Sequence, residues 1–283
     1  MSNETALAYQ VYVAPIIAMA GNDAPPGQSR STWSPISATL ISGGHDAVLV
    51  DPLMTVEQGM AVADWVSTTG KNLTTVYVTH GHGDHWFGLG AVRERFPGVR
   101  AVATPAVVQG MRKSSAPKLL QTFWQPRFPG QIPDDNPVAD PLDGRSFELE
   151  GRPLVAVDVG HTDTDDTTVL HVPEIGLVVA GDAAYNGVHQ YLAESDPQGR
   201  RDWLAALDII EALEPRAVVA GHKRYGNDDN PRIIEETRRY IRDFDRLDQE
   251  TTTPEELYWQ MLAIHPDRVN PGALWLSAQS AKA

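Results

Sequence analysis

The sequence predicts an α/β fold, because short valine-rich runs alternate with amphipathic helical segments. Seven runs have the length and the β-branched composition of buried strands. They are residues 47–50, 75–78, 100–103, 154–159, 168–172, 177–180 and 217–220. A chain of 283 residues is long enough to bury a sizeable core, as one large domain or two small ones.

Two helices are expected between these strands. Apolar residues recur at helical spacing in residues 55–69 and again in residues 200–213, where Trp203, Leu207 and Ile210 share one face. Both segments can therefore bury one face against a sheet.

Three further helices are expected in the last quarter of the chain. Three pairs join a capping side chain to a proline suited to the first helical position. They are Asn230-Pro231, Thr253-Pro254 and Asn270-Pro271. Thr253 and Glu256 also have the spacing of a capping box. We expect a catalytic domain over residues 1–230 and a helical extension over residues 231–283 that docks on it.

Two segments, residues 21–34 and 116–136, are dense in proline, glycine and polar residues. They also contain Trp33, Phe123 and Trp124, a composition typical of ordered functional loops. The aromatic side chains either anchor surface loops or contact a substrate.

The composition restricts the partners and the possible metal ligands. The chain has 23 Lys and Arg against 37 Asp and Glu, a net charge of −14 that repels phosphate backbones and anionic lipids. We therefore expect a small-molecule substrate, with neither nucleic acid nor membrane as a partner. With no cysteine, histidine and carboxylate are the strong metal ligands available.

No targeting segment is expected. The first ten residues lack the basic region of a secretory signal, and no stretch approaches the roughly 20 apolar residues of a membrane span. These features favour a cytoplasmic protein, whereas the oligomeric state is not predicted.

Four side chains of metal-ligand type lie within six residues, directly after the expected strand at 75–78. They are His80, His82, Asp84 and His85. Extended chain places residues i and i+2 on one side, so the first two histidines can converge on one ion. The intervening glycines allow a tight turn, which lets the last two side chains face a second ion.

Three later strands each end in a glycine followed by another ligand-type residue. The pairs are Gly160-His161, Gly181-Asp182 and Gly221-His222. Catalytic groups gather at strand ends in α/β folds, so these residues and the preceding cluster would together supply seven ligands.

The order and spacing of these motifs, over about residues 10 to 230, resemble the metallo-β-lactamase superfamily. The resemblance implies an αβ/βα sandwich of two mixed sheets flanked by helices, with a dinuclear metal site at one edge. It also implies that His80, His82 and His161 hold the first ion, that Asp84, His85 and His222 hold the second, and that Asp182 bridges them. Two divalent ions are expected, with Zn²⁺ the default and Mn²⁺ or Fe²⁺ compatible.

The carboxylate at Asp182 distinguishes among branches of that family. True β-lactamases usually carry cysteine or serine there, so the site is more similar to those of glyoxalase II, lactonases and thioesterases. Tyr185 has a spacing similar to the tyrosine that acyl-homoserine lactonases aim at the substrate carbonyl; its alternative role is a packed tyrosine at a strand end.

The predicted reaction is hydrolysis of a lactone, ester or thioester by a hydroxide that bridges two metal ions. Asp84 or Asp182 would relay the proton to the leaving group, and Tyr185 would help to stabilise the oxyanion. The alternatives are hydrolysis of β-lactams and, on the same fold, an iron-dependent oxidoreductase.

Three further residues have two possible roles each. Asp51 either supports a ligating histidine or caps a turn, and His189 either supports the site or lies on the surface. Lys223 either binds a substrate carboxylate or pairs with nearby acidic side chains.

Overall fold

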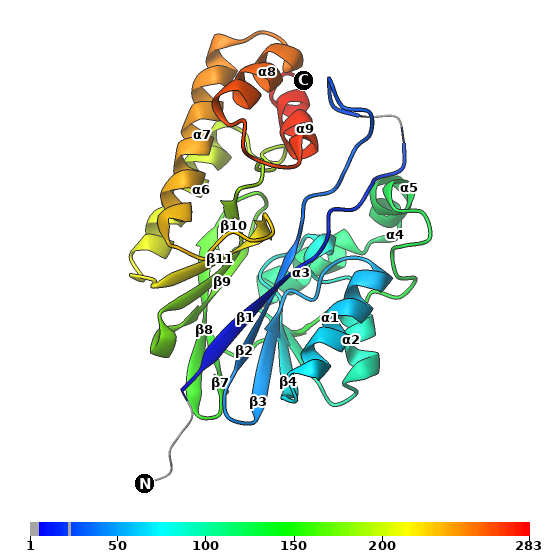
Figure 1. The fold of residues 1–283 in the computed structure, drawn as a ribbon, viewed down its shortest axis with the longest axis vertical. Coiled ribbons are helices and arrows are strands. Elements are labelled where there is room, and N and C mark those ends of the chain that lie inside the picture. Colours follow the sequence, from blue (N-terminus) through cyan, green and yellow to red (C-terminus); the bar gives the residue numbers. More distant parts are fainter. Residues whose placement is uncertain (1–5, 22–23) are drawn as a thin grey trace.

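Two β-sheets pack face to face and helices cover the outer face of each, as Figure 1 shows. This computed structural model describes residues 6–21 and 24–283. The four-layer arrangement confirms the predicted αβ/βα sandwich.

Six strands form the first sheet, in the order β1-β2-β3-β4-β5-β6. They are β1 (Ala8–Val13), β2 (Ser37–Ser42), β3 (Asp46–Val50), β4 (Asn72–Tyr77), β5 (Arg100–Ala103) and β6 (Asp140–Pro141). Strands β3 to β6 are parallel, whereas β1, β2 and β3 pair antiparallel.

Five strands form the second sheet, in the order β11-β10-β9-β8-β7. They are β7 (Ser146–Leu149), β8 (Arg152–Gly160), β9 (Thr167–Val172), β10 (Leu177–Asn186) and β11 (Ala217–Lys223). Strands β10 and β11 run parallel, so the residues that end them emerge at the same edge of the sheet.

All seven predicted runs overlap strands of the structure, but β1, β2, β6 and β7 were not predicted. Strand β1 lies at an edge and its residues are only partly buried, so no continuous apolar run marks it.

Between the sheets, aromatic and aliphatic side chains form a shared core. The ring of Tyr77 stacks on Phe147 with centroids 5.8 Å apart, and the Tyr77 hydroxyl lies 2.7 Å from Oγ1 of Thr168. These contacts join the strand that precedes the histidine cluster to the opposite sheet.

Helices α1 (Val56–Thr68), α2 (Leu89–Arg95) and α3 (Pro105–Ser114) enclose a hydrophobic core on the outer face of the first sheet. The predicted helix at 55–69 is thus confirmed. It begins with a capping box, in which Thr55 and Gln58 satisfy one another's backbone N–H groups.

On the second sheet lie α6 (Pro197–Glu211), α7 (Arg232–Glu250), α8 (Pro254–Ile264) and α9 (Pro271–Ala281), which share another core. The capping box of Thr253 and Glu256 is confirmed at the start of α8. Asn270 does not cap α9, because its backbone is left-handed (φ 58°) and its side chain contacts Ser34 instead. The division into two domains at residue 230 stays a prediction.

The segment expected as a loop at 116–136 is helical over its first half. It forms α4 (Pro117–Leu119), a π-helical turn η2 (Leu120–Trp124) and α5 (Gln125–Arg127). Within the other expected loop, 21–34, residues 22–23 lie outside the described part of the chain. None of the helices in the described ranges is both long enough and apolar enough to cross a membrane.

Candidate metal centre

The histidine cluster lies where β4 ends and the chain turns into a short 3-10 helix, η1 (Gly83–His85). This turn crosses α3 so closely that a Cβ on Gly81 would lie 2.8 Å from Cα of Gly110. Glycine is therefore required at 81. The crossing buries His80, Asp84 and His85 completely or almost so.

Asp182 and His222 reach the same place from the second sheet. A Cβ on Gly221 would lie 2.3 Å from Oδ1 of Asp182, so glycine in β11 makes room for the carboxylate. Oδ1 of Asp182 lies 3.2 Å from Nε2 of His85, and Oδ2 lies 3.1 Å from Nε2 of His222. The strand, glycine, ligand pattern thus brings two of its three predicted side chains to the cluster.

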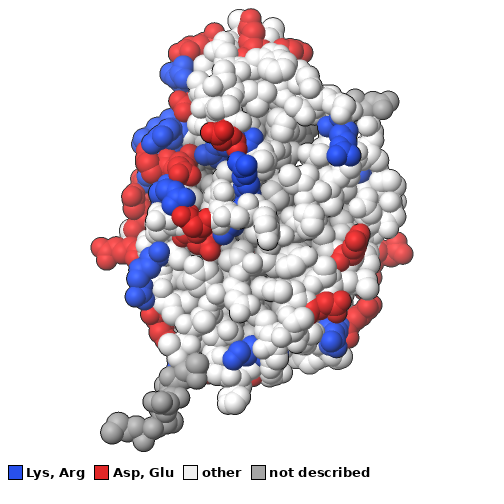
Figure 2. Space-filling view, in the orientation of Figure 1, with Lys and Arg blue, Asp and Glu red and all other residues white. Residues whose placement is uncertain are grey.

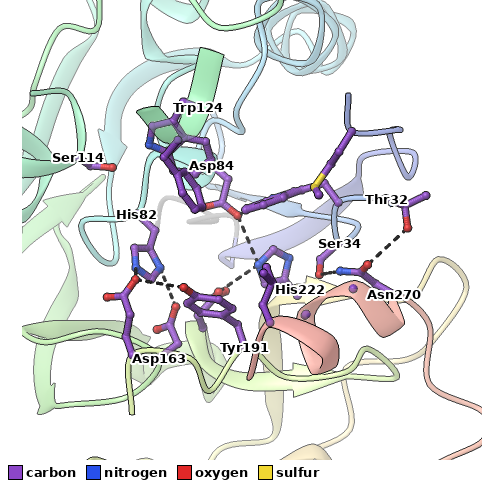
Figure 3. A pocket seen from close by; sticks show the side chains of 18 of the residues that line it. Thr32, Ser34, His82, Asp84, Ser114, Trp124, Asp163, Tyr191, His222 and Asn270 are labelled. Carbon is purple, nitrogen blue, oxygen red and sulfur yellow. Dashed lines mark hydrogen bonds and ion pairs between the residues drawn. The ribbon is translucent and has the colours of Figure 1, made fainter. Parts of the chain in front are cut away.

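The ligand atoms form two main groups, each with its atoms within 4.8 Å of one another. One contains His80, His82, Asp163 and Asp182, and the other contains Asp84, His85 and His222. An overlapping group joins Asp51 to His80 and His85. Six of the seven predicted ligands are therefore brought together, and Figure 3 shows several of them around one cavity.

His161 is the exception, because it belongs to none of these groups. The pairing of β8 with β9 shifts register next to Gly160, whose φ is +83°. The imidazole of His161 turns away, with Nδ1 at 2.7 Å from Asp165 and Nε2 at 2.9 Å from Oγ of Ser195.

Asp163 lies where His161 was expected, and it was not predicted from the sequence. Its Oδ2 is 2.8 Å from Nδ1 of His82 and 3.9 Å from Nε2 of His80. Asp163 belongs to a turn rich in threonine and aspartate, in which no periodicity singles out one carboxylate.

The buried atoms of the cluster show whether a metal ion fits. Nε2 of His80, Oδ2 of Asp163 and Oδ1 of Asp182 are buried and have no hydrogen-bond partner. Unpaired buried polar atoms are costly, and lone pairs that converge without protons between them repel. A divalent cation stabilises such a donor set, so the residues fit a metal site.

Neighbouring hydrogen bonds orient the histidine nearest the centre. The Thr79 hydroxyl donates to Oδ2 of Asp51 at 2.7 Å, and therefore accepts from Nδ1 of His80 at 2.9 Å. This fixes the tautomer in which Nε2 of His80 carries a free lone pair toward the cluster. Asp51 also lies 3.5 Å from Nδ1 of His85, so it supports two ligating histidines.

The pKa values of His80 and Asp182 are both shifted toward the form that binds a cation. Burial, helped by the neighbouring charge of His85, lowers the pKa of His80 to about 3, so this ring is neutral at neutral pH. Burial alone would raise the pKa of Asp182, but His222 and His85 hold it well below its ordinary value. Neutral imidazole and ionised carboxylate are the forms that bind metals.

Tyr185 lies behind the ligand cluster, and its predicted catalytic role stays a prediction. Its side chain is completely buried, and its hydroxyl donates a hydrogen bond of 2.9 Å to Oδ2 of Asp182. It is not among the described residues that line the cavity. Tyr185 instead orients the central carboxylate from behind.

Two other residues with open roles are structural. His189 is buried in the fold of the C-terminal helices, with Nδ1 3.0 Å from the Tyr240 hydroxyl. Lys223 forms an ion pair with Asp229 and is not among the described residues that line the cavity.

A cavity of about 140 Å³ opens over the two ligand groups. Five ligand residues form part of its lining: His82, Asp84, Asp163, Asp182 and His222. Large apolar side chains line much of the rest, including Met19, Trp33, Leu119, Phe123 and Leu276, and polar side chains such as Ser34, Tyr191, Glu194 and Asn270 complete the lining. Among the described lining residues there is no lysine or arginine.

Two separate parts of the chain supply these apolar side chains. Trp33 packs against Phe123, Trp124 and Phe128, with ring centroids 5.4 to 6.3 Å apart. Helix α9 contributes Ala273 and Leu276 from the C-terminal end of the chain. The helical extension therefore forms part of the cavity.

Comparison with known proteins places this fold and site in a family. The model of the metallo-beta-lactamase superfamily matches residues 31–222. The chain belongs to this superfamily. Its matched region includes all seven of the predicted ligands and Asp163.

Curated members of this superfamily and solved structures resemble the chain over much of its length. A UPF0173 metal-dependent hydrolase of Agrobacterium fabrum is 29% identical over 54% of this chain and 73% of its own, and one of Brucella anthropi is 27% identical over the same shares. A metallo-beta-lactamase family protein of Thermus thermophilus has TM-score 0.60 at 20% identity, covering 93% of this chain and 91% of its own. A metallo-beta-lactamase of Pontibacter korlensis has TM-score 0.59 at 18% identity, covering 82% of this chain and 99% of its own.

Proposed function

We propose that this superfamily member is a dinuclear metal-dependent hydrolase that cleaves an ester, lactone or thioester with an uncharged, apolar acyl group. The family, the curated relatives and the clustered ligands support the metal-dependent hydrolase. The apolar part of the cavity lining supports an uncharged, apolar acyl group.

The position of Asp182 carries the proposal. Its carboxylate belongs to the group of His80 and His82, and its two oxygens also lie within 3.2 Å of His85 and His222. A buried carboxylate between two sets of donors is suited to bridge two cations.

The groups around Asp182 would divide the ions between them. His80 and His82 would hold the first ion, and Asp84, His85 and His222 the second. Two divalent ions so placed lower the pKa of water and polarise a carbonyl group. Zn²⁺ is the proposed native ion, and the nitrogen and oxygen donors also accept Mn²⁺ or Fe²⁺.

Asp84 is placed to move a proton during hydrolysis. It lines the cavity, and its Oδ2 accepts a hydrogen bond of 2.9 Å from Nε1 of Trp33, which fixes its direction. In the reaction, water adds to the acyl carbon and the bond from that carbon to the leaving oxygen or sulfur breaks. Asp84 would take the proton from the water and return it to the leaving group.

The lining indicates the kind of substrate. Apolar side chains surround the ligand groups, and no described lysine or arginine is present to pair with an anionic substrate. On the face shown in Figure 2, basic side chains are interspersed with acidic ones and form no continuous basic patch. We therefore propose a small neutral molecule as the substrate and no nucleic acid partner.

The cavity lining also bears on the alternative functions, a β-lactamase and an iron-dependent oxidoreductase. A β-lactam antibiotic carries a carboxylate, for which the described lining offers no cationic partner. An iron-dependent oxidoreductase would use the same donor residues. The reaction, and not the ligand set, therefore distinguishes it from the proposed hydrolase.

The test measures proton release in weak buffer at neutral pH, across neutral lactones, esters, thioesters and β-lactams. Metal-loaded wild type is compared with Asp182→Ala and with Asp64→Ala, a matched change on the exposed surface of α1. We expect release from one class of acyl substrate, lost in Asp182→Ala and retained in Asp64→Ala.

Two results would contradict the proposal. Equal rates for wild type and Asp182→Ala would exclude a role for the bridging carboxylate. Oxygen uptake with iron-loaded protein, in the absence of proton release from any acyl substrate, would assign the site to the oxidoreductase alternative.

A further inference from the structure

The geometry points to Asp163, and not His161, as the third ligand that this chain provides to the first metal ion. This inference rests on the proposed dinuclear centre and concerns the identity of one ligand in it. The seven metal ligands are then four imidazoles and three carboxylates, whereas the motif order implies five imidazoles and two carboxylates.

The carboxylate of Asp163 has the burial and the position of a ligand. The side chain is 1% exposed, and the ring nitrogens of two clustered histidines are polar neighbours of Oδ2. That oxygen lies 2.8 Å from Nδ1 of His82 and 3.9 Å from Nε2 of His80, so one ion can contact all three atoms.

The second oxygen of Asp163 is held from the opposite side. Oδ1 accepts a hydrogen bond of 3.0 Å from the hydroxyl of Thr162. The carboxylate is thus fixed with only Oδ2 directed at the histidines, as outer hydrogen bonds commonly fix a ligating group.

His161 has no ring nitrogen left for a metal. Nδ1 lies 2.7 Å from a carboxylate oxygen of Asp165, which can only accept. Nε2 lies 2.9 Å from Oγ of Ser195, whose hydroxyl proton goes to the carbonyl of Thr162 at 2.7 Å. Both ring nitrogens are therefore occupied by partners outside the ligand groups, whereas a metal requires a free lone pair.

Packing also keeps His161 in place. A Cβ on Gly199, in the first turn of α6, would lie 2.6 Å from Nε2 of His161. The ring rests directly on the helix, and turning it toward His80 would break both of its hydrogen bonds. His161 is thus held against α6 by partners outside the ligand groups.

The chemical consequence is a harder first site. A carboxylate in place of an imidazole adds one negative charge and an oxygen donor, which suits Mn²⁺ and Fe²⁺ better than a purely nitrogen set does. With Asp163 as a ligand, each site has two imidazoles and one carboxylate besides the shared Asp182.

The test measures metal binding directly. Metal-stripped wild type, Asp163→Asn, His161→Gln and Asp165→Asn are titrated with Zn²⁺ against a chromogenic chelator, and bound metal is counted by mass spectrometry. Asp165→Asn is the matched control, since it makes the same change two residues away in the same turn. The absorption spectrum of bound Co²⁺ reports the ligands independently of activity.

The inference predicts that wild type, His161→Gln and Asp165→Asn each bind two metal ions per chain. It predicts that Asp163→Asn binds one of the two ions at least about tenfold more weakly and changes the Co²⁺ spectrum. Loss of an ion in His161→Gln, or two ions at wild-type affinity in Asp163→Asn, would overturn it.

The outcome for wild type separates this inference from the proposed function. A wild-type chain that binds no divalent ion would refute the metal-dependent hydrolase itself. If Asp163→Asn does not fold, anomalous diffraction from metal-soaked wild-type crystals decides the question. An ion about 2.0–2.2 Å from Asp163 supports the inference, and one at that distance from His161 overturns it.

Discussion

The indole N–H of Trp33 donates a hydrogen bond of 2.9 Å to Oδ2 of Asp84. Trp33 comes from the segment that follows β1, whereas Asp84 belongs to the histidine cluster after β4. The bond joins the apolar part of the cavity to the carboxylate proposed to move the proton.

Replacing Trp33 with phenylalanine keeps the aromatic packing and removes this hydrogen bond. Asp84 then loses its fixed direction, so we expect kcat to fall about 10–100-fold with a smaller change in KM. Steady-state kinetics on the substrate found in the proton-release panel measures this. Trp259→Phe, on the exposed surface of α8, should match wild type. A rise in KM with unchanged kcat would show that Trp33 acts only through substrate packing.

Tyr185→Phe tests whether the phenol orients Asp182 or acts on the substrate. Loss of the 2.9 Å hydrogen bond should weaken metal binding about tenfold and lower kcat, with KM unchanged because the side chain does not line the cavity. Chelator competition and kinetics provide the two readouts. Full metal affinity together with a loss of kcat would restore the direct catalytic role predicted from the sequence.

Phe123→Ala should reduce the preference for long over short acyl groups. Phe123 lines the cavity and packs edge-on against Trp33. Removing part of the apolar wall costs about 1–2 kcal/mol of binding for a long chain and little for acetyl, which is about a 5–30-fold change in the ratio of kcat/KM values. Ile264→Ala, exposed at the end of α8, is the control. An equal loss for short and long acyl groups would contradict an acyl-binding wall.

The lowered pKa of His189 predicts that the free energy of unfolding depends on pH. Burial, with the charges of Arg268 and His265, lowers the pKa of His189 to about 3 from its ordinary 6.5. The unfolded chain therefore binds a proton between pH 6.5 and 3 that the folded chain does not. This contribution to stability is complete above pH 6.5 and is lost as the pH falls, by up to about 1.4 kcal/mol per unit.

Urea unfolding of metal-stripped protein at several pH values measures this effect. His189→Gln has no proton to bind at this position, so its stability should decline less steeply with acid than that of wild type. His45→Gln, an exposed histidine in the turn before β3, is the comparison variant. Parallel curves for wild type and His189→Gln would contradict the assignment.

The sequence predicted those ligands whose direction follows from regular structure. His80 and His82 follow a buried parallel strand, and Asp182 and His222 lie on neighbouring parallel strands, so their order along the chain determines where they meet. The αβ/βα arrangement followed from the family resemblance once those motifs were recognised.

The position of Asp163 within the ligand groups, and of His161 outside them, was not predicted because a register shift separates sequence position from side-chain direction. Beyond Gly160 the chain leaves the strand, and each side chain then points where its hydrogen bonds hold it. The helical segment from Pro117 to Arg127 was missed for a related reason. Its proline content indicated a loop, whereas Pro117 occupies the first turn, where proline is tolerated.

The most direct test of the central claim follows hydrolysis while metal is added to stripped protein. The dinuclear account predicts that Zn²⁺ or Mn²⁺ binds to two equivalents per chain, and that proton release from the acyl substrate reaches its full rate only as the second equivalent binds. Undiminished hydrolysis by the stripped protein, or a full rate with only one equivalent bound, would contradict it.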